Sequence, residues 1–379
     1  MEAKNQNAYM FTKLEALRGV AACFVVLYHS EYFFSQELVG STMRFFSDRS
    51  VRFVSNAYLF VDFFFIISGF VMSFAYSNKI KSGLTLRSYA ILRLGRIYPL
   101  HIFMLFVFVA YTALKVYLHS KGMAPEPELN KNNINTFVSN ILLLHSLGLH
   151  QHLSWNLPSW SISVEFYTYI IFFIFTKYLD TKESMFVPLF ISIIAFCSLL
   201  IIGEPDLEIT KDYGIIRCIA SFYLGIFLLR LKLKIDQHQF NINIAELLSV
   251  LFVALSVCFA HKGWLFQLMT IISFFTLLYV YSNEQSGYLG GLLKTAPMRA
   301  VGLWSYSIYL LHFFLLSISY VFMKVIFKVS QDQIVGINAV VMNIVMLLIT
   351  ILISRFTYIH IEARMRQKVK LFIAHKSKS

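Results

Sequence analysis

The sequence is poor in charged residues. Of its 379 residues only 14% are Asp, Glu, Lys or Arg, whereas 58% are hydrophobic and 17% are aromatic. A soluble globular protein carries roughly a quarter charged residues, so the shortage excludes an ordinary soluble domain and indicates an integral membrane protein. The charge that is present is mainly basic, with a net value of +13. In a membrane protein such an excess marks cytoplasmic loops and headgroup contacts, and we expect no nucleic-acid partner.

Cysteine is equally scarce. The four cysteines lie in apolar runs, where they are best interpreted as small buried hydrophobic residues. They are too few for a disulfide framework, and no two have a C-x-x-C spacing, so we predict no metal site. Internal repeats, low-complexity tracts and a separate soluble segment are also lacking. The apolar run after Arg18 continues past Cys23, which predicts a retained helix and no cleaved signal peptide.

Long apolar runs take the place of charge. A helix that spans a bilayer needs about 20 mainly apolar residues. The sequence therefore predicts an all-α polytopic membrane bundle of about ten transmembrane helices, forming one domain over residues 1–379. The predicted spans are 14–34, 57–77, 98–118, 160–178, 185–202, 214–230, 244–261, 264–281, 302–325 and 334–354.

An eleventh run, 134–149, is shorter and more polar. With ten spans and a cytoplasmic N-terminus, the basic loop 78–97 and the basic tail 355–379 lie inside, while the acidic loop 203–213 lies outside. An eleventh span would turn the tail outward, against the positive-inside rule. We therefore predict that 134–149 is a re-entrant or interfacial segment and that both termini are cytoplasmic. The loop 35–56 opposes this topology mildly, because it lies outside yet contains more basic than acidic residues.

Two ionisable residues flank the first apolar run, which reads EALRGVAACFVVLYHS over residues 15–30. Arg18 and His29 are eleven residues apart, just over three helical turns, so they share one face about 16 Å apart along the axis. Either residue alone is explained by contact with headgroups or by a hydrogen bond to a neighbouring helix. Because ionisable groups are costly inside lipid, the two together favour a polar track through the bundle.

A pair of arginines precedes the run 98–118. Arg93 and Arg96 are three residues apart and share a helix face. Two guanidinium groups at the inner interface could bind phosphate bidentately, although ordinary cytoplasmic anchoring explains them equally well in isolation. Pro99 is expected in the first turn of this helix, where it costs no hydrogen bond.

Two carboxylates and a second histidine fall inside predicted spans. Glu165 lies about five residues into 160–178, and Asp62 lies near the outer end of 57–77, both at a depth comparable with that of His29. A buried carboxylate needs a partner, so the three could converge on one site. Hydrogen bonding between helices also accounts for Glu165, and a helix-start role accounts for Asp62. His312 is either a second site residue or a packed histidine bonded to a carbonyl, and packing is favoured.

Other histidines carry no such pattern. No partner lies at a meaningful spacing from them, so we expect surface or interfacial positions. These residues are His101, His145, His150 and His152.

Five short segments occur in a fixed order along the chain. They are LEALRGVAA at 14–22 followed by His29, DFFFIISGF at 62–70, RLGRIYP at 93–99, WSISVEF at 160–166 and SYSIYLLH at 305–312. In this order they resemble the motifs of the acyltransferase-3 family of bacterial membrane O-acyltransferases. Each motif is weak alone, but the ordered set spans residues 14–312 and is highly specific. Glu15 departs from the commoner aspartate. The family's frequent C-terminal esterase-like domain does not follow the motifs, which leaves open whether a separate envelope-glycan enzyme completes the transfer.

The resemblance implies transfer of an acyl group, most often acetyl, from cytoplasmic acyl-CoA to a carbohydrate hydroxyl at the outer face of the bacterial inner membrane. O-antigen, capsule and exopolysaccharide are all open as acceptors. Acetyl-CoA would be the acyl donor, held by Arg18, Arg93 and Arg96. His29 would act as the base, with Glu165 or Asp62 orienting its ring. Direct attack and an acyl-histidine intermediate both stay open.

Two other classes of protein stay open. A secondary transporter also uses intramembrane ionisable residues, although transporters commonly show repeated halves that this sequence lacks. A structural or assembly protein of an envelope-polysaccharide pathway is the other. Acyl-CoA turnover by the purified protein would separate catalysis from both. The sequence leaves the acceptor, the acyl length and the oligomeric state undetermined.

Overall fold

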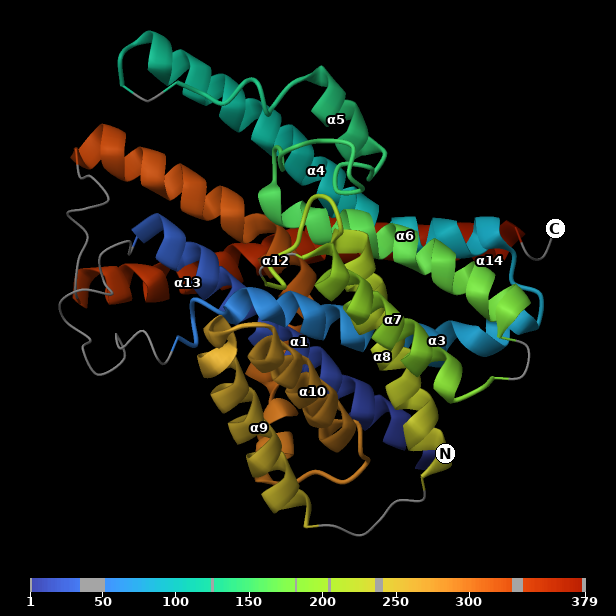
Figure 1. The fold of residues 1–379 in the computed structure, drawn as a ribbon. Helices are drawn as coiled ribbons and strands as arrows, with labels where there is room; N and C mark the ends of the chain where they lie inside the picture. Colours follow the sequence, from blue (N-terminus) through green and yellow to red (C-terminus); the bar gives the residue numbers. More distant parts are fainter. Residues whose placement is uncertain are drawn as a thin grey trace.

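The computed structural model describes residues 2–34, 52–123, 126–180, 183–203, 206–235, 241–328 and 337–376. Every regular element within these ranges is helical, which confirms the all-α prediction. Figure 1 shows α9 and α10 at one side of the bundle and α4 and α5 at the other. The α-helices are α1 (Glu2–Phe34), α3 (Phe60–Lys81), α4 (Leu86–Ser120), α5 (Ile134–Ile141), α6 (Trp160–Ile174), α7 (Phe186–Ile202), α8 (Gly214–Lys234), α9 (Ile242–Phe259), α10 (Trp264–Tyr281), α11 (Tyr288–Leu293), α12 (Ala296–Phe322), α13 (Ile337–Thr357) and α14 (Arg364–Lys376).

Short helical turns extend or join several of these helices. The 3₁₀ turns are η1 (Ala57–Leu59), η2 (Leu157–Ser159) and η4 (Ala260–Lys262). The π-helical turns are η3 (Phe175–Leu179), η5 (Met323–Phe327) and η7 (Tyr358–Ala363).

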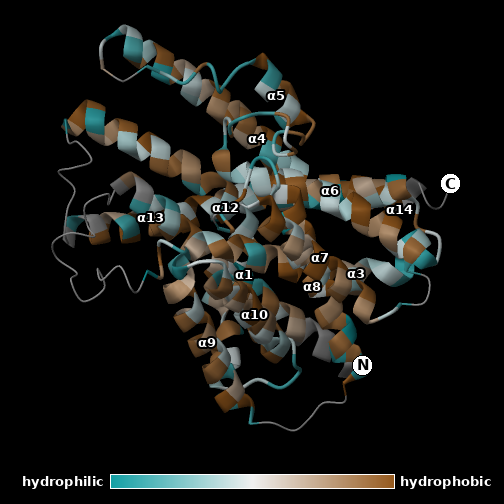
Figure 2. Ribbon diagram, in the orientation of Figure 1, coloured by the Kyte–Doolittle hydropathy of each residue, from teal (hydrophilic) through white to brown (hydrophobic). Residues whose placement is uncertain are grey.

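Each predicted span coincides with a helix. Within the described residues, eight helical stretches are long and apolar enough to cross a membrane. Two predicted spans are not among these eight stretches: α7, which has 17 residues, and α1. Large apolar side chains remain exposed, such as Ile201 (85%) and Leu352 (69%). Figure 2 shows brown along much of α7 and α9. The molecule is therefore a multi-pass membrane protein, while the number of crossings and the side of each terminus stay predictions. Of the loop 35–56, whose charge opposed the topology, residues 35–51 lie outside the described residues.

The predicted outer segment does not span. Its helix α5 has eight residues, about 12 Å at 1.5 Å per residue, whereas the hydrocarbon core is about 30 Å thick.

The expectation of surface positions is wrong for His101 and His145, whose rings are buried and stack 5.6 Å apart. His101 Nε2 lies 2.9 Å from the Asn140 carbonyl oxygen, and His145 Nε2 lies 3.1 Å from that of Ser159. These carbonyl groups lie 39 and 14 residues along the chain from the two histidines, so a search for short spacings between residues could not find the contacts.

The start of α4 also differs from the prediction. The helix begins at Leu86, where the Thr85 side chain accepts a hydrogen bond from the Ser88 amide at 3.2 Å. Arg93 and Arg96 therefore lie inside the helix, and Pro99 lies in its interior rather than in its first turn. The helix begins before its apolar run and includes the charged residues of 86–97. Apolar length and charge alone do not distinguish an exposed helical turn from a loop, so the sequence placed these residues in a loop.

Paired glycines set how the central helices meet. A Cβ atom on Gly19 of α1 would lie 2.7 Å from the Gly302 amide nitrogen of α12, so the two backbones touch. His29 and His312 each follow these glycines by ten residues. Because both helices run in the same direction from this contact, His29 and His312 reach the same level and face each other.

A second glycine pair joins α3 to α8. A Cβ on Gly69 would lie 1.8 Å from the Phe222 carbonyl oxygen, and one on Gly225 would lie 2.0 Å from that of Ile66. Any larger side chain would separate these helices. Asp62 and Arg217 precede the two glycines by about two turns, and the close backbone approach brings them into contact.

Candidate active site

Three pockets share lining residues in pairs, and we name them inner, central and outer after the predicted topology. The inner pocket, of about 190 Å³, is lined by Arg93, Arg96 and Arg366 among others. The central pocket, of about 80 Å³, shares Arg93 and Arg96 with it and adds Arg18 and Glu165. The outer pocket, of about 300 Å³, is lined by His29, and Val61 and Tyr309 line both it and the central pocket. Neighbouring pockets therefore share lining residues, and Arg18 and His29 line two pockets that share Val61 and Tyr309. The predicted polar track through the bundle stays a prediction.

The central pocket is cationic. Three guanidinium groups, from Arg18, Arg93 and Arg96, line it against the single carboxylate of Glu165. Arg93 donates hydrogen bonds to the Tyr76 hydroxyl and, at 3.1 Å, to the Met72 sulfur. Within the described part of the chain, Arg18 and Arg96 form no hydrogen bond or ion pair. Guanidinium groups placed in this way are able to bind an anion.

Glu165 lies in this central pocket rather than beside His29. Its Oε1 accepts hydrogen bonds from the Ser68 and Tyr169 hydroxyls, both at 2.6 Å, and these hydroxyls are 2.9 Å apart. The structure therefore gives no geometric support to the hypothesis that Glu165 orients the His29 ring. The depth of a residue along its helix was predictable, but the face that meets a given neighbour depends on helix rotation.

The partner of His29 is His312. The carbonyl oxygen of Tyr309 lies 2.6 Å from His312 Nδ1, and His312 Nε2 lies 3.1 Å from His29 Nδ1. The Val25 carbonyl oxygen is 3.0 Å from the same His29 Nδ1. His312 is fully buried, whereas His29 is half-buried at the wall of the outer pocket. His312 is thus a packed histidine bonded to a carbonyl oxygen, the interpretation that the sequence favoured. It also contacts His29, and this contact was not predicted.

These contacts assign the neutral tautomers. A carbonyl oxygen can only accept, so the proton of each ring lies on Nδ1. His312 Nε2 then carries a lone pair and accepts a hydrogen bond from His29 Nδ1. The Val25 carbonyl oxygen is a second acceptor of the same proton. His29 Nε2 is consequently unprotonated. The arrangement presents a base nitrogen from a half-buried ring that lines the outer pocket.

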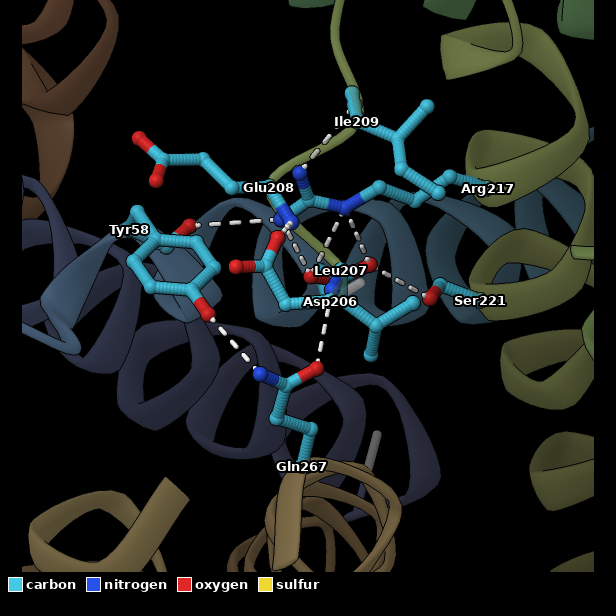
Figure 3. Close-up of polar contacts among 9 residues, drawn as sticks. Tyr58, Asp206, Leu207, Glu208, Ile209, Arg217, Ser221 and Gln267 are labelled. Atoms are coloured by element: carbon cyan, nitrogen blue, oxygen red, sulfur yellow. Dashed lines mark hydrogen bonds and ion pairs between the residues drawn. The ribbon is translucent and has the colours of Figure 1, made fainter. Parts of the chain in front are cut away.

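Asp62 is held by an arginine. Its carboxylate accepts hydrogen bonds from Arg217 at 2.6 Å and from the Ser221 hydroxyl at 3.0 Å. Both charged side chains are almost completely buried. Figure 3 shows Arg217 also donating to the carbonyl oxygens of Ile209 and Tyr58. The hypothesis that Asp62 orients His29 therefore gains no support, because its carboxylate is occupied by Arg217 and Ser221. Arg217 was overlooked, although an arginine near the start of the apolar run 214–230 was itself a signal.

We predict that removing one partner of this pair destabilises the protein strongly. Asp62→Leu or Arg217→Met alone should lower the free energy of unfolding by about 3–5 kcal/mol, because each leaves a buried charge without a partner. The double variant should be more stable than either single variant. Thermal unfolding in detergent measures this, with Asp212→Asn as the control because the Lys211–Asp212 pair is exposed. Additive losses in the double variant would contradict the pairing.

Comparison with known proteins agrees with the motifs. The family model described as "Acyltransferase domain" matches residues 11–358. The chain belongs to this acyltransferase family. The match contains every residue that lines the central and outer pockets, whereas Arg366 of the inner pocket lies beyond it.

Two curated proteins are similar to this acyltransferase. "Putative peptidoglycan O-acetyltransferase YrhL" of Bacillus subtilis (strain 168) is 24% identical over 97% of the chain and 56% of the relative. "Protein 2 in picA locus" of Rhizobium radiobacter is 36% identical over 27% of the chain and 45% of the relative. The chain thus spans about half the length of the curated relatives it matches. No solved structure matches it.

Proposed function

We propose that this acyltransferase moves an acyl group, most often acetyl, from cytoplasmic acyl-CoA to a hydroxyl of an envelope carbohydrate outside the bacterial inner membrane. The observation that carries the proposal is a cationic pocket that shares two lining residues, Val61 and Tyr309, with the pocket lined by His29. The similarity to YrhL, whose name states peptidoglycan O-acetylation, supports both the acetyl group and a carbohydrate acceptor.

The donor end of the path is formed by the arginines. Arg18, Arg93 and Arg96 would bind the phosphate groups of the coenzyme, since planar guanidinium groups match phosphate oxygens bidentately. Arg366 of α14 lines the inner pocket with two of them and adds a fourth cation. The acyl-pantetheine arm, which is uncharged, would extend through the central pocket toward Val61 and Tyr309.

His29 would serve as the general base. Its Nε2 takes the proton of the acceptor hydroxyl as the hydroxyl oxygen attacks the thioester carbonyl carbon. The C–O bond forms, the C–S bond breaks, and the imidazolium returns the proton to the departing thiolate of coenzyme A. Charge balances at each stage, and no other co-reactant is required. We infer direct attack because the ring lines the outer pocket, which would also receive the acceptor.

His312 would be a positioning residue for His29. We predict that His312→Leu lowers kcat about 10- to 100-fold without raising the KM for acyl-CoA, because the His29 proton loses an acceptor and the ring loses its orientation. His312→Gln, which retains an acceptor atom at that distance, should recover most of the loss. Steady-state kinetics of the two variants measures the effect. Equal losses in both, with a raised KM, would indicate a structural role instead.

The proposal is tested with purified protein in lipid nanodiscs and acetyl-CoA labelled in its acetyl group. We expect release of free coenzyme A, and transfer of label when an acceptor glycan is supplied. Stable label on His29 in the absence of acceptor would replace direct attack by an acyl-histidine mechanism. If intact acetyl-CoA is never consumed, while proteoliposomes accumulate a solute, the transporter alternative is correct and the proposed function is wrong.

A further inference from the structure

We propose that the outer pocket binds an uncharged sugar ring of the acceptor and that Glu208 is the carboxylate that receives its hydroxyl groups. This inference rests on the proposed function and adds the chemical class of the acceptor to it. Glu208 lies in the loop before α8, which entered the sequence analysis only through its net charge.

The pocket has the size and lining of a site for a polar organic ligand. Its volume is about 300 Å³, and its walls combine the rings of Tyr28, Tyr58 and Trp160 with apolar side chains. A few polar groups among mainly apolar and aromatic walls are typical of a small-molecule site. The C–H faces of a sugar ring can pack on such walls, while its hydroxyl groups require hydrogen-bonding partners.

The arginine in the wall carries no spare positive charge for an anion. Arg217 lines the pocket, but its Nε and one terminal nitrogen bind Asp62, and the other terminal nitrogen binds the Ile209 carbonyl oxygen. The buried Asp62 carboxylate therefore neutralises it. An anionic sugar that entered would have to displace a buried ion pair, which is costly.

Glu208 supplies the remaining formal charge among the described lining residues. The Tyr28 hydroxyl donates to its Oε1, and within the described residues no partner occupies Oε2. Figure 3 shows the Glu208 side chain extending away from the Arg217 guanidinium. An ionised carboxylate accepts hydroxyl donors through short, strong hydrogen bonds and repels anions.

The loop holds Glu208 in a defined position. The Leu207 amide donates to Gln267 Oε1 at 2.8 Å, and the Glu208 amide donates to Asp206 Oδ1 at 2.8 Å. Gln267 in turn donates to the Tyr58 hydroxyl at 3.2 Å, which links the loop to the pocket wall. These contacts fix the backbone at Glu208, and the Tyr28 hydroxyl holds its Oε1, so the carboxylate has a defined place from which it can discriminate between ligands by charge.

The test compares two acceptors that differ only at C6, the tetrasaccharide of β-1,4-linked glucose and that of β-1,4-linked glucuronic acid. Purified protein in nanodiscs receives labelled acetyl-CoA with each. We expect kcat/KM for the neutral acceptor to exceed that for the anionic one by about tenfold or more. Glu208→Gln, which keeps an acceptor oxygen and removes the charge, should reduce this ratio about tenfold while leaving the KM for acetyl-CoA unchanged. Asp212→Asn is the matched control, since Asp212 lies on the same loop, pairs with Lys211 and does not line the pocket.

The outcomes separate this inference from the proposed function. Equal use of both tetrasaccharides by the wild type, or an identical response of Glu208→Gln and Asp212→Asn, overturns the assignment. Acetyl-CoA turnover that no neutral oligosaccharide accelerates or inhibits also overturns it, yet leaves the proposed acyl-CoA chemistry intact. Absence of any acetyl-CoA turnover overturns the proposed function itself.

Discussion

Replacing His29 by alanine is expected to lower kcat for acyl transfer by about a thousandfold, within the range of 10²–10⁴ that general acid–base catalysis contributes. The acyl-CoA dissociation constant should not change, because the guanidinium groups that would bind the coenzyme line the central pocket and His29 lines the outer one. Binding and turnover of labelled acetyl-CoA by the same nanodisc preparation measure the two effects separately.

A matched control for this variant is His150→Ala. His150 hydrogen bonds Ser139 and lies outside the three pockets, so its loss should leave kcat intact. An imidazole added in solution should restore part of the activity of His29→Ala if the ring acts as a base. A variant that keeps more than a tenth of wild-type kcat, or that loses coenzyme binding as well, would refute the assignment of His29.

Replacing Arg18 and Arg96 together by methionine is expected to weaken acyl-CoA binding by at least a hundredfold. Both side chains line the central pocket without a partner among the described residues, and a hydrogen bond to a charged group contributes about 1.5–3 kcal/mol. Each single variant should therefore weaken binding about tenfold or more. Arg96→Lys should recover only part of its loss, since an ammonium cannot bind phosphate bidentately. Equilibrium binding of labelled acetyl-CoA measures all of these variants.

Two controls make this result specific to the phosphate groups. Arg87→Met removes an exposed arginine of α4 that lines none of the three pockets and should have no effect. S-acetylpantetheine, which lacks the nucleotide and its phosphates, should bind the wild type and the double variant equally. If the double variant loses S-acetylpantetheine binding to the same extent, the arginines maintain the shape of the pocket and do not bind phosphate.

The sequence was most informative where a residue type conflicted with its surroundings. Arg18, Arg93 and Arg96 were identified because cations are unexpected next to apolar runs, and the structure gathers them around one pocket. The same reasoning should have selected Arg217, which lies within an apolar run. Loop residues gave no such conflict, because a carboxylate on an outer loop is ordinary, and Glu208 was therefore missed.

Pairings between distant segments were least predictable. Depth along a helix placed Asp62, Glu165 and His29 at one level, but side chains at one level contact only when their helices also face each other. The glycine contacts between α1 and α12, and between α3 and α8, decide that orientation. They direct His29 toward His312 and Asp62 toward Arg217, and neither contact could be read from depth along a helix.

By itself the sequence determined the class of protein, the positions of its helices, the cationic residues and the family. Each of these follows from local quantities, namely apolar length, charge and the order of short motifs. The tertiary structure alone decided which side chains share a pocket, which tautomer His29 adopts and where the charge of Arg217 is neutralised. Those features depend on contacts between residues as far apart as 283 positions, and such contacts arise only when helices pack with a particular rotation and register.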